Sequence, residues 1–128
     1  MKKYIQLGIL AFIGMMMSAT AQPKPTAKAE IKTPTAVCIQ CKAIIEAAVP
    51  KQVDGLIKIN VIFKRGVTMV QWYPDRTNIE ELKTAIANAG FDADDVTANI
   101  DYYKKLPVCC KKVADGGGVP KKKKPGTK

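Results

Sequence analysis

The sequence has 128 residues, a formal net charge of +10, four cysteines and no histidine. This length allows one small domain with tails. The sequence has neither a histidine nor a paired carboxylate motif for acid–base catalysis, which argues against an enzyme. The positive charge is not a property of the domain, because residues 30–110 contain ten basic and ten acidic side chains. The excess lies in the terminal segments, so we expect no basic face for nucleic acid.

The first 21 residues have the three parts of a secretory signal peptide. Two lysines follow Met1, an apolar stretch covers residues 5–17, and residues 18–21 form a small-residue cleavage site. We predict cleavage after Ala21 and export to the periplasm or the extracellular space. The proline-containing residues 22–29 are expected to form an extended linker.

The apolar periodicity that follows predicts the element order β-α-β-β-α-β, with alternation such as Ile57, Ile59 and Val61 on one strand face. A helix over residues 42–49 should end before Pro50, and Thr77 should cap the second helix. The expected strands are residues 30–33, 57–63, 67–73 and 96–100. Right-handed connections would then place both helices on one face of a four-stranded antiparallel sheet, the ferredoxin-like α+β sandwich. We assign this domain to residues 30–100.

Cys38 and Cys41 lie where the first predicted strand gives way to the first helix. The free N–H groups and the dipole at a helix N-terminus favour a thiolate there. Thiolates bind soft metal ions and also carry out disulfide exchange, so the spacing alone leaves a metal site and a redox site open. A disulfide between residues three apart would stabilise the fold little, which favours chemistry at the thiols.

Three further landmarks accompany Cys38-x-x-Cys41, and together the four resemble one family. They are Asp54-Gly55-Leu56, Val70-x-Trp72-x-Pro74 and Ala89-Gly90-Phe91-Asp92-Ala93. Over residues 30–98 the chain resembles the heavy-metal-associated domain of copper chaperones, metal-transporting P-type ATPases and periplasmic mercury-binding proteins. The resemblance implies that Cys38 and Cys41 are the metal ligands and that Phe91 lies beside the metal loop. The family usually has methionine where this chain has Ala36, which Val37 follows in the loop.

The resemblance implies an exported metallochaperone or scavenger that passes a soft ion to a metal transporter or to another metal-binding domain. Two thiolates without imidazole favour copper(I) and suit mercury, whereas zinc prefers about four ligands. We therefore expect copper(I) first, with mercury, zinc or cadmium as alternatives, bound by a monomer. The rival interpretations are a thiol–disulfide redox protein that uses the same motif and an adaptor domain that leaves it unused.

Cys109 and Cys110 form a second pair after the predicted domain, in residues 101–128. Either they supply a supplementary metal ligand, or they are an unused pair beside a tail predicted to be disordered from Gly116 onward. A fourth strand would lead the chain away from the end of the sheet that carries the first cysteine pair. We therefore expect Cys109 and Cys110 to lie far from that pair without metal. The lysines at 121–124 are expected to be solvated or to contact an acidic surface.

Overall fold

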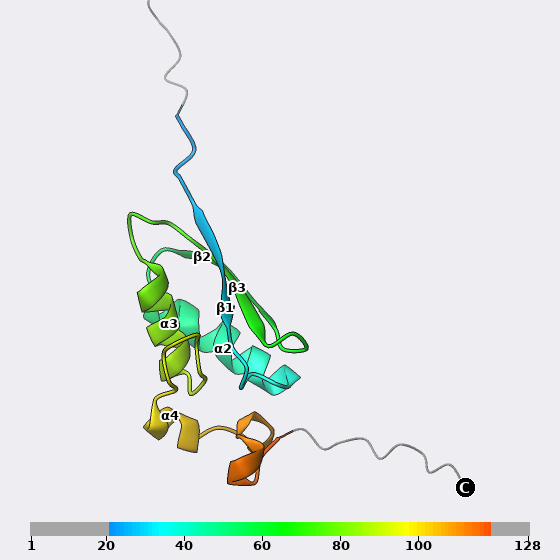
Figure 1. Ribbon diagram of the computed structural model, residues 1–128. Coiled ribbons are helices and arrows are strands. Elements are labelled where there is room, and N and C mark those ends of the chain that lie inside the picture. The colour runs from blue at the N-terminus through cyan, green and yellow to red at the C-terminus, as the bar shows by residue number, and fades with distance from the viewer. Residues whose placement is uncertain (1–20, 119–128) are drawn as a thin grey trace, which may run out of the picture.

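The computed structural model describes residues 21–118 (Figure 1). The predicted signal peptide, apart from Ala21, and the lysine-rich end of the tail lie outside the described residues. Within residues 21–118, no helix is both long and apolar enough to cross a membrane. The elements in chain order are β1 (Ala27–Lys32), α2 (Ile39–Gln52), β2 (Leu56–Ile62), β3 (Val67–Trp72), α3 (Ile79–Asn88) and α4 (Ile100–Lys104), followed by 3₁₀ turns at Val108–Cys110 and Val113–Asp115.

Three antiparallel strands form the sheet, in the order β1-β3-β2. Lys32 of β1 and Ile62 of β2 both pair with Val67 of the central strand. The β2–β3 register shifts near the start of β2, which places one extra residue on β2. This bulge explains why Ile57 is 40% exposed, although the alternation of the sequence predicted it on the core face.

The fourth strand expected at residues 96–100 is absent from the described part of the chain. A tight turn precedes this segment, in which Asp94 has a φ of 50°, and α4 begins at Ile100. Asp94 also meets the end of β1: its backbone N–H donates to Lys32 O, and its carboxylate accepts from the Lys32 N–H, both at 2.8 Å. A short polar turn thus pairs with the edge of β1, and the sheet has three described strands rather than four.

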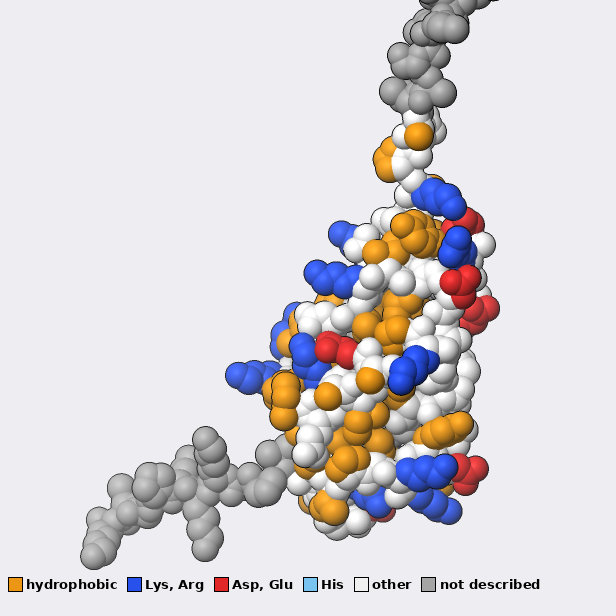
Figure 2. Space-filling view, turned by 180° about the vertical axis from the view of Figure 1, so that it is seen from behind, with side chains coloured by type: hydrophobic (Ala, Val, Ile, Leu, Met, Phe, Trp, Pro, Cys, Tyr) orange, Lys and Arg blue, Asp and Glu red, His pale blue; other side chains and the backbone are white. Residues whose placement is uncertain are grey.

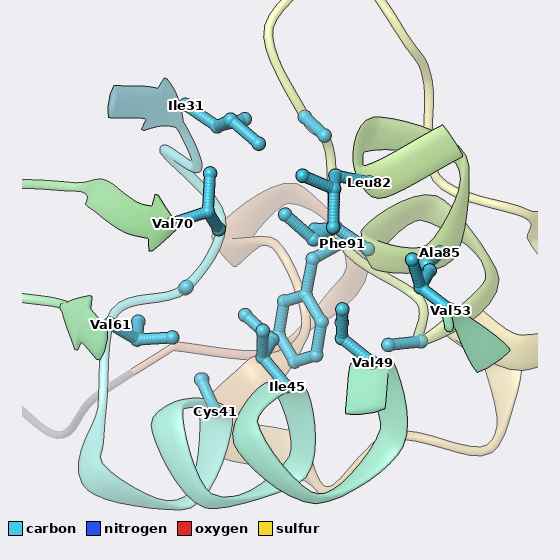
Figure 3. Packing of buried hydrophobic residues seen from close by; sticks show 14 of the residues in the cluster. Ile31, Cys41, Ile45, Val49, Val53, Val61, Val70, Leu82, Ala85 and Phe91 are labelled. Atoms are coloured by element: carbon cyan, nitrogen blue, oxygen red, sulfur yellow. The ribbon is translucent and has the colours of Figure 1, made fainter. Parts of the chain in front are cut away.

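One hydrophobic core lies between the sheet and the two longer helices (Figure 3). Ile31 and Val70 from the strands share this core with Ile45 of α2 and Leu82 of α3. Because all four side chains belong to one cluster, α2 and α3 cover the same face of the sheet. The class predicted from sequence, α+β, is therefore confirmed.

Both helix boundaries differ from the sequence prediction in detail. Helix α2 continues through Pro50 to Gln52. The missing N–H of Pro50 removes one hydrogen bond of the last turn, and this loss does not end the helix at Val49. Helix α3 is capped by Asn78 rather than Thr77, since the Asn78 side chain accepts from the Glu81 N–H at 2.9 Å. Thr77 instead donates its hydroxyl to the Glu81 carboxylate at 2.7 Å, so the cap lies one residue later than predicted.

Residues 100–118, called here the C-terminal segment, fold back against the domain below α2 and α3 (Figure 1). The segment begins beside the end of α3, where the Asn99 N–H donates to Ala87 O at 2.9 Å. Leu106 belongs to the hydrophobic core and is 8% exposed. Gly90 leaves room for it, because a Cβ at this position would lie 3.0 Å from Leu106 Cδ1. The chain therefore stays at this end of the domain and does not cross the sheet.

Charged side chains of both signs lie on the surface. On the face in Figure 2 they lie around apolar side chains that run down its middle. Ion pairs join different elements, for example Arg65 with Glu30 at 3.5 Å and Lys83 with Asp95 at 3.1 Å. These pairs are partly solvent-exposed, so each contributes little to stability.

Candidate metal centre

The loop between β1 and α2 places Cys38 and Cys41 at the start of a helix, as the sequence predicted. Cys38 is the N-cap residue, with φ −140° and ψ 168°, and its carbonyl accepts from the Lys42 N–H at 3.2 Å. Cys41 lies in the first turn and is completely buried, whereas Cys38 is half-buried. Their Sγ atoms are 3.0 Å apart, close enough for both to contact one ion.

Backbone and hydroxyl hydrogen bonds fix the loop that leads into the motif. The Thr33 N–H donates to Gly66 O at 2.8 Å, and the Ala36 N–H donates to Thr33 O at 3.1 Å. Beneath the loop, the buried hydroxyls of Thr33 and Thr68 are 3.0 Å apart. Ala36 is fully buried and Val37 is 39% exposed. The small residue thus faces the core, and the larger one lies on the surface beside Cys38.

Phe91 is fully buried and occupies the middle of the core. Its ring lies against α2, next to Ile45 and Val49 (Figure 3). Cys41 precedes Ile45 by one helical turn, so both lie on the same face of α2. Phe91 therefore supports the helix that carries Cys41.

The structure brings the second cysteine pair to the first. Cys109 Sγ lies 3.0 Å from Cys38 Sγ, and Cys110 Sγ lies 2.8 Å from Cys41 Sγ and 3.6 Å from Cys38 Sγ. The prediction that the pairs lie far apart without metal is therefore wrong. It assumed a fourth strand that would carry the chain to the other end of the sheet. Without that strand, the chain needs only a short return from α4 to reach the motif.

Contacts outside the sulfur cluster hold the second pair in place. Cys109 Sγ donates to Gln40 Oε1 at 2.8 Å, and Cys110 is 1% exposed within the core. Further along, the Lys112 N–H donates to the Tyr103 hydroxyl at 2.7 Å, and Lys112 Nζ pairs with Asp92 Oδ2 at 3.4 Å. Sequence reasoning missed Gln40, although its position inside the C-x-x-C motif was a signal.

The four thiols differ in acidity because they differ in burial and in their hydrogen bonds. Burial raises the pKa of Cys38, but hydrogen bonds with Cys109 and Cys41 outweigh this effect and lower it to about 7. Burial raises the pKa of Cys41, and burial together with the hydrogen bonds to Cys41 and Cys38 raises that of Cys110. The hydrogen bond with Cys38 is the main cause that raises the pKa of Cys109. Cys38 is thus the thiol that ionises first.

The cluster consists of sulfur alone, which limits its chemistry. The Sγ atoms of Cys38, Cys109 and Cys110 all lie within 4.8 Å of one another, and all four cysteines, Cys41 included, are free thiols. Thiolates select soft ions such as copper(I), and also zinc. The same groups can form disulfides, so the geometry allows metal binding and thiol–disulfide exchange.

Comparison with known proteins places this fold and motif in a family. No model of a protein family matches the chain. Over 80 residues, the chain is 31% identical to the periplasmic component of the mercuric transport protein of Shewanella putrefaciens. The match covers 62% of this chain and 84% of that protein.

Solved structures share the architecture. The N-terminal domain of a potential copper-translocating P-type ATPase from Bacillus subtilis, in its Cu(I)-loaded state, is 26% identical, with a TM-score of 0.51 over 55% of this chain and 86% of that chain. The oxidized MerP of Ralstonia metallidurans CH34 has the same fold at 24% identity, with a TM-score of 0.51 over 55% of this chain and 96% of that chain. The sequence relationship and the shared fold establish that this chain belongs to the heavy-metal-associated domain family of metal-binding proteins.

Proposed function

We propose that this protein binds one soft metal ion through the thiolates of Cys38 and Cys41 and passes it to another thiol-containing domain. The observation that carries the proposal is the pair of Sγ atoms 3.0 Å apart at the start of α2. No imidazole competes for the ion, because the sequence has no histidine. The protein is then a binding protein rather than an enzyme.

Copper(I) is the ion that we expect first, with mercury next. Both are satisfied by few sulfur ligands, which is what one C-x-x-C pair offers. The names of the relatives support both ions, since one is a mercuric transport component and another is a domain solved with Cu(I). Zinc and cadmium remain alternatives that need more ligands than Cys38 and Cys41 supply.

Delivery to a metal transporter fits the unequal exposure of the two sulfurs. Cys41 is buried, whereas Cys38 is half-buried and lies beside the exposed Val37. An incoming thiolate would therefore reach the ion from the side of Cys38. The periplasmic relative and the signal-like first 21 residues support export, with cleavage after Ala21. The metal-binding domain in this proposal extends beyond the expected residues 30–100, because β1 begins at Ala27 and the core includes Leu106 and Cys110. The protein acts as a monomer.

Competition for copper(I) against a chelator tests the proposal. The Cys38→Ser/Cys41→Ser variant should lose tight binding of copper(I) while keeping the circular-dichroism spectrum of the wild type. Val37→Ser is the matched control, because it places a serine beside the site and keeps all four thiols. A double variant that competes for copper(I) as well as the wild type would refute the assignment.

Thiol–disulfide exchange is the second candidate, and the clustering of four thiols favours it. In that case, the reduced protein should reduce a model peptide disulfide in a reaction that depends on Cys38. Both experiments use the same variants. If the Cys38→Ser/Cys41→Ser variant no longer reduces the peptide but still binds copper(I), the function is thiol–disulfide exchange and not metal delivery.

A further inference from the structure

The C-terminal segment places two more sulfurs beside the C-x-x-C pair. Cys109 lies against Cys38, and Cys110 lies against Cys41 and Cys38. We propose that Cys109 and Cys110 complete a four-thiolate site with Cys38 and Cys41, for a cargo ion that takes three or four sulfur ligands. This inference rests on the proposed function, since it adds ligands to the same site.

The sulfur spacings are closer to a tetrahedral site than to a linear one. With metal–sulfur bonds of 2.3 Å, the sulfur–sulfur edge of a tetrahedral site is about 3.8 Å, and the span of a linear two-sulfur site is about 4.6 Å. Cys109 and Cys110 are 3.8 Å apart, and Cys38 and Cys110 are 3.6 Å apart. The contacts of 2.8–3.0 Å for three other pairs must open by about 0.8–1.0 Å to reach the tetrahedral edge. Cys41 stands outside the group of sulfurs that all lie within 4.8 Å of one another, so Cys41 and Cys109 must move closer together for all four to bind one ion.

Contacts that involve no sulfur hold the C-terminal segment in this position. Leu106 lies in the core against Gly90. Beyond the cysteines, Lys112 pairs with Asp92, and its N–H donates to the Tyr103 hydroxyl. Because these contacts do not involve the sulfurs, they order the segment without help from metal–sulfur bonds, which lowers the ordering entropy that binding must supply.

Packing alone accounts for Cys110, which is a small buried side chain in the core. It accounts less well for Cys109, which is only half-buried at the edge of the core. Cys109 Sγ is aimed at Cys38 and is also hydrogen-bonded to Gln40. A polar partner that orients a sulfur toward the site is the arrangement found around metal ligands.

The composite site widens the class of ions that the protein can hold beyond copper(I). A pair of thiolates suits copper(I), whereas four thiolates suit zinc and cadmium. On binding, metal–sulfur bonds form and the thiol protons are released to solvent. The two cysteines in cis also occupy the positions that a partner's thiolates would take, so release of the ion requires the C-terminal segment to move away.

Metal-edge X-ray absorption of the reduced protein loaded with Cd²⁺ tests the composite site. We expect about four sulfur neighbours in the wild type and about two in Cys109→Ser/Cys110→Ser, the others being replaced by oxygen or nitrogen. Cys109→Ser alone should leave about three, and this half-buried position keeps the core intact if the double variant fails to fold. Val37→Ser, which retains all four thiols, should keep the wild-type count.

The outcomes separate this inference from the proposed function. An unchanged sulfur count in Cys109→Ser and in the Cys109/Cys110 double variant would overturn the composite site and leave the two-thiolate proposal standing. Retention of Cd²⁺ and copper(I) by Cys38→Ser/Cys41→Ser would overturn the proposed function itself. A sulfur count that falls by one for each cysteine removed supports four ligands from the same chain.

Discussion

The Sγ atom of Cys110 lies 2.8 Å from the Sγ atom of Cys41, although 69 positions separate the two residues in the sequence. Both side chains are buried in one core. The C-terminal segment is therefore part of the domain's packing and not an appended tail. Stability, thiol reactivity and metal binding should consequently change together when the contacts of this segment are altered.

Alkylation of the metal-free protein should modify Cys38 first. Its pKa is lowered from the ordinary value of 9.0 to about 7, whereas Cys41 and Cys110 are buried and have raised pKa values. Because the thiolate is the reactive form, the alkylation rate of Cys38 should fall only when the pH drops below about 7. The alkylation rate of an ordinary thiol would already fall below pH 9.0. Peptide mass spectrometry after brief iodoacetamide treatment measures this. Equal modification of Cys110 at pH 7 would contradict the packing described above.

Leu106→Ala should loosen the C-terminal segment. The side chain is 8% exposed in the core, so its truncation should cost about 2 kcal/mol or more in the free energy of unfolding. Urea denaturation gives this value, and faster alkylation of Cys110 should accompany it. Val113→Ala is the control, because Val113 is 81% exposed. If both variants behave like the wild type, Leu106 does not anchor the segment.

Gly90→Ala should be more destabilising than Gly116→Ala. Both glycines have positive φ, 99° and 77°, so both substitutions strain the backbone. An added Cβ at Gly90 would also lie 3.0 Å from Leu106 Cδ1, whereas Gly116 has nothing within 4 Å. The extra cost of Gly90→Ala should be about 1–3 kcal/mol, again from urea denaturation. Equal costs would mean that the segment does not press against Gly90.

Oxidation should remove metal binding. A disulfide between Cys38 and Cys41, or between either of them and the second pair, consumes the thiolates that hold the ion. Protein treated with a mild oxidant should fail to bind copper(I) until a reductant is added, and thiol trapping shows which cysteines have reacted. Undiminished copper(I) binding by protein shown to hold the Cys38–Cys41 disulfide would exclude the two-thiolate site.

The sequence was sufficient to place the motif. The extended residues before Cys38 and the apolar spacing after Cys41 predicted a helix N-terminus, and the structure has Cys38 as the N-cap of α2. These are local signals, in which propensity and periodicity agree with the fold. Shifts of one or two residues, such as the cap at Asn78 and the helix through Pro50, depend on hydrogen bonds that periodicity does not report.

The position of the second cysteine pair was not predictable in the same way. It depends on whether residues 96–100 form a strand, and the sequence there is too short and polar to decide. In the structure, Asp94 pairs with the end of β1, and the chain enters α4 instead. Leu106 then finds the space beside Gly90. These are long-range contacts, and only the folded chain brings their partners together.

Native mass spectrometry of the reduced protein with copper(I) tests the central claim most directly. We predict one copper ion per wild-type chain and none on Cys38→Ser/Cys41→Ser, with Val37→Ser retaining the ion as the wild type does. A wild-type chain that retains no copper, or a Cys38→Ser/Cys41→Ser chain that still retains one ion, would contradict the claim that this thiolate pair binds the metal.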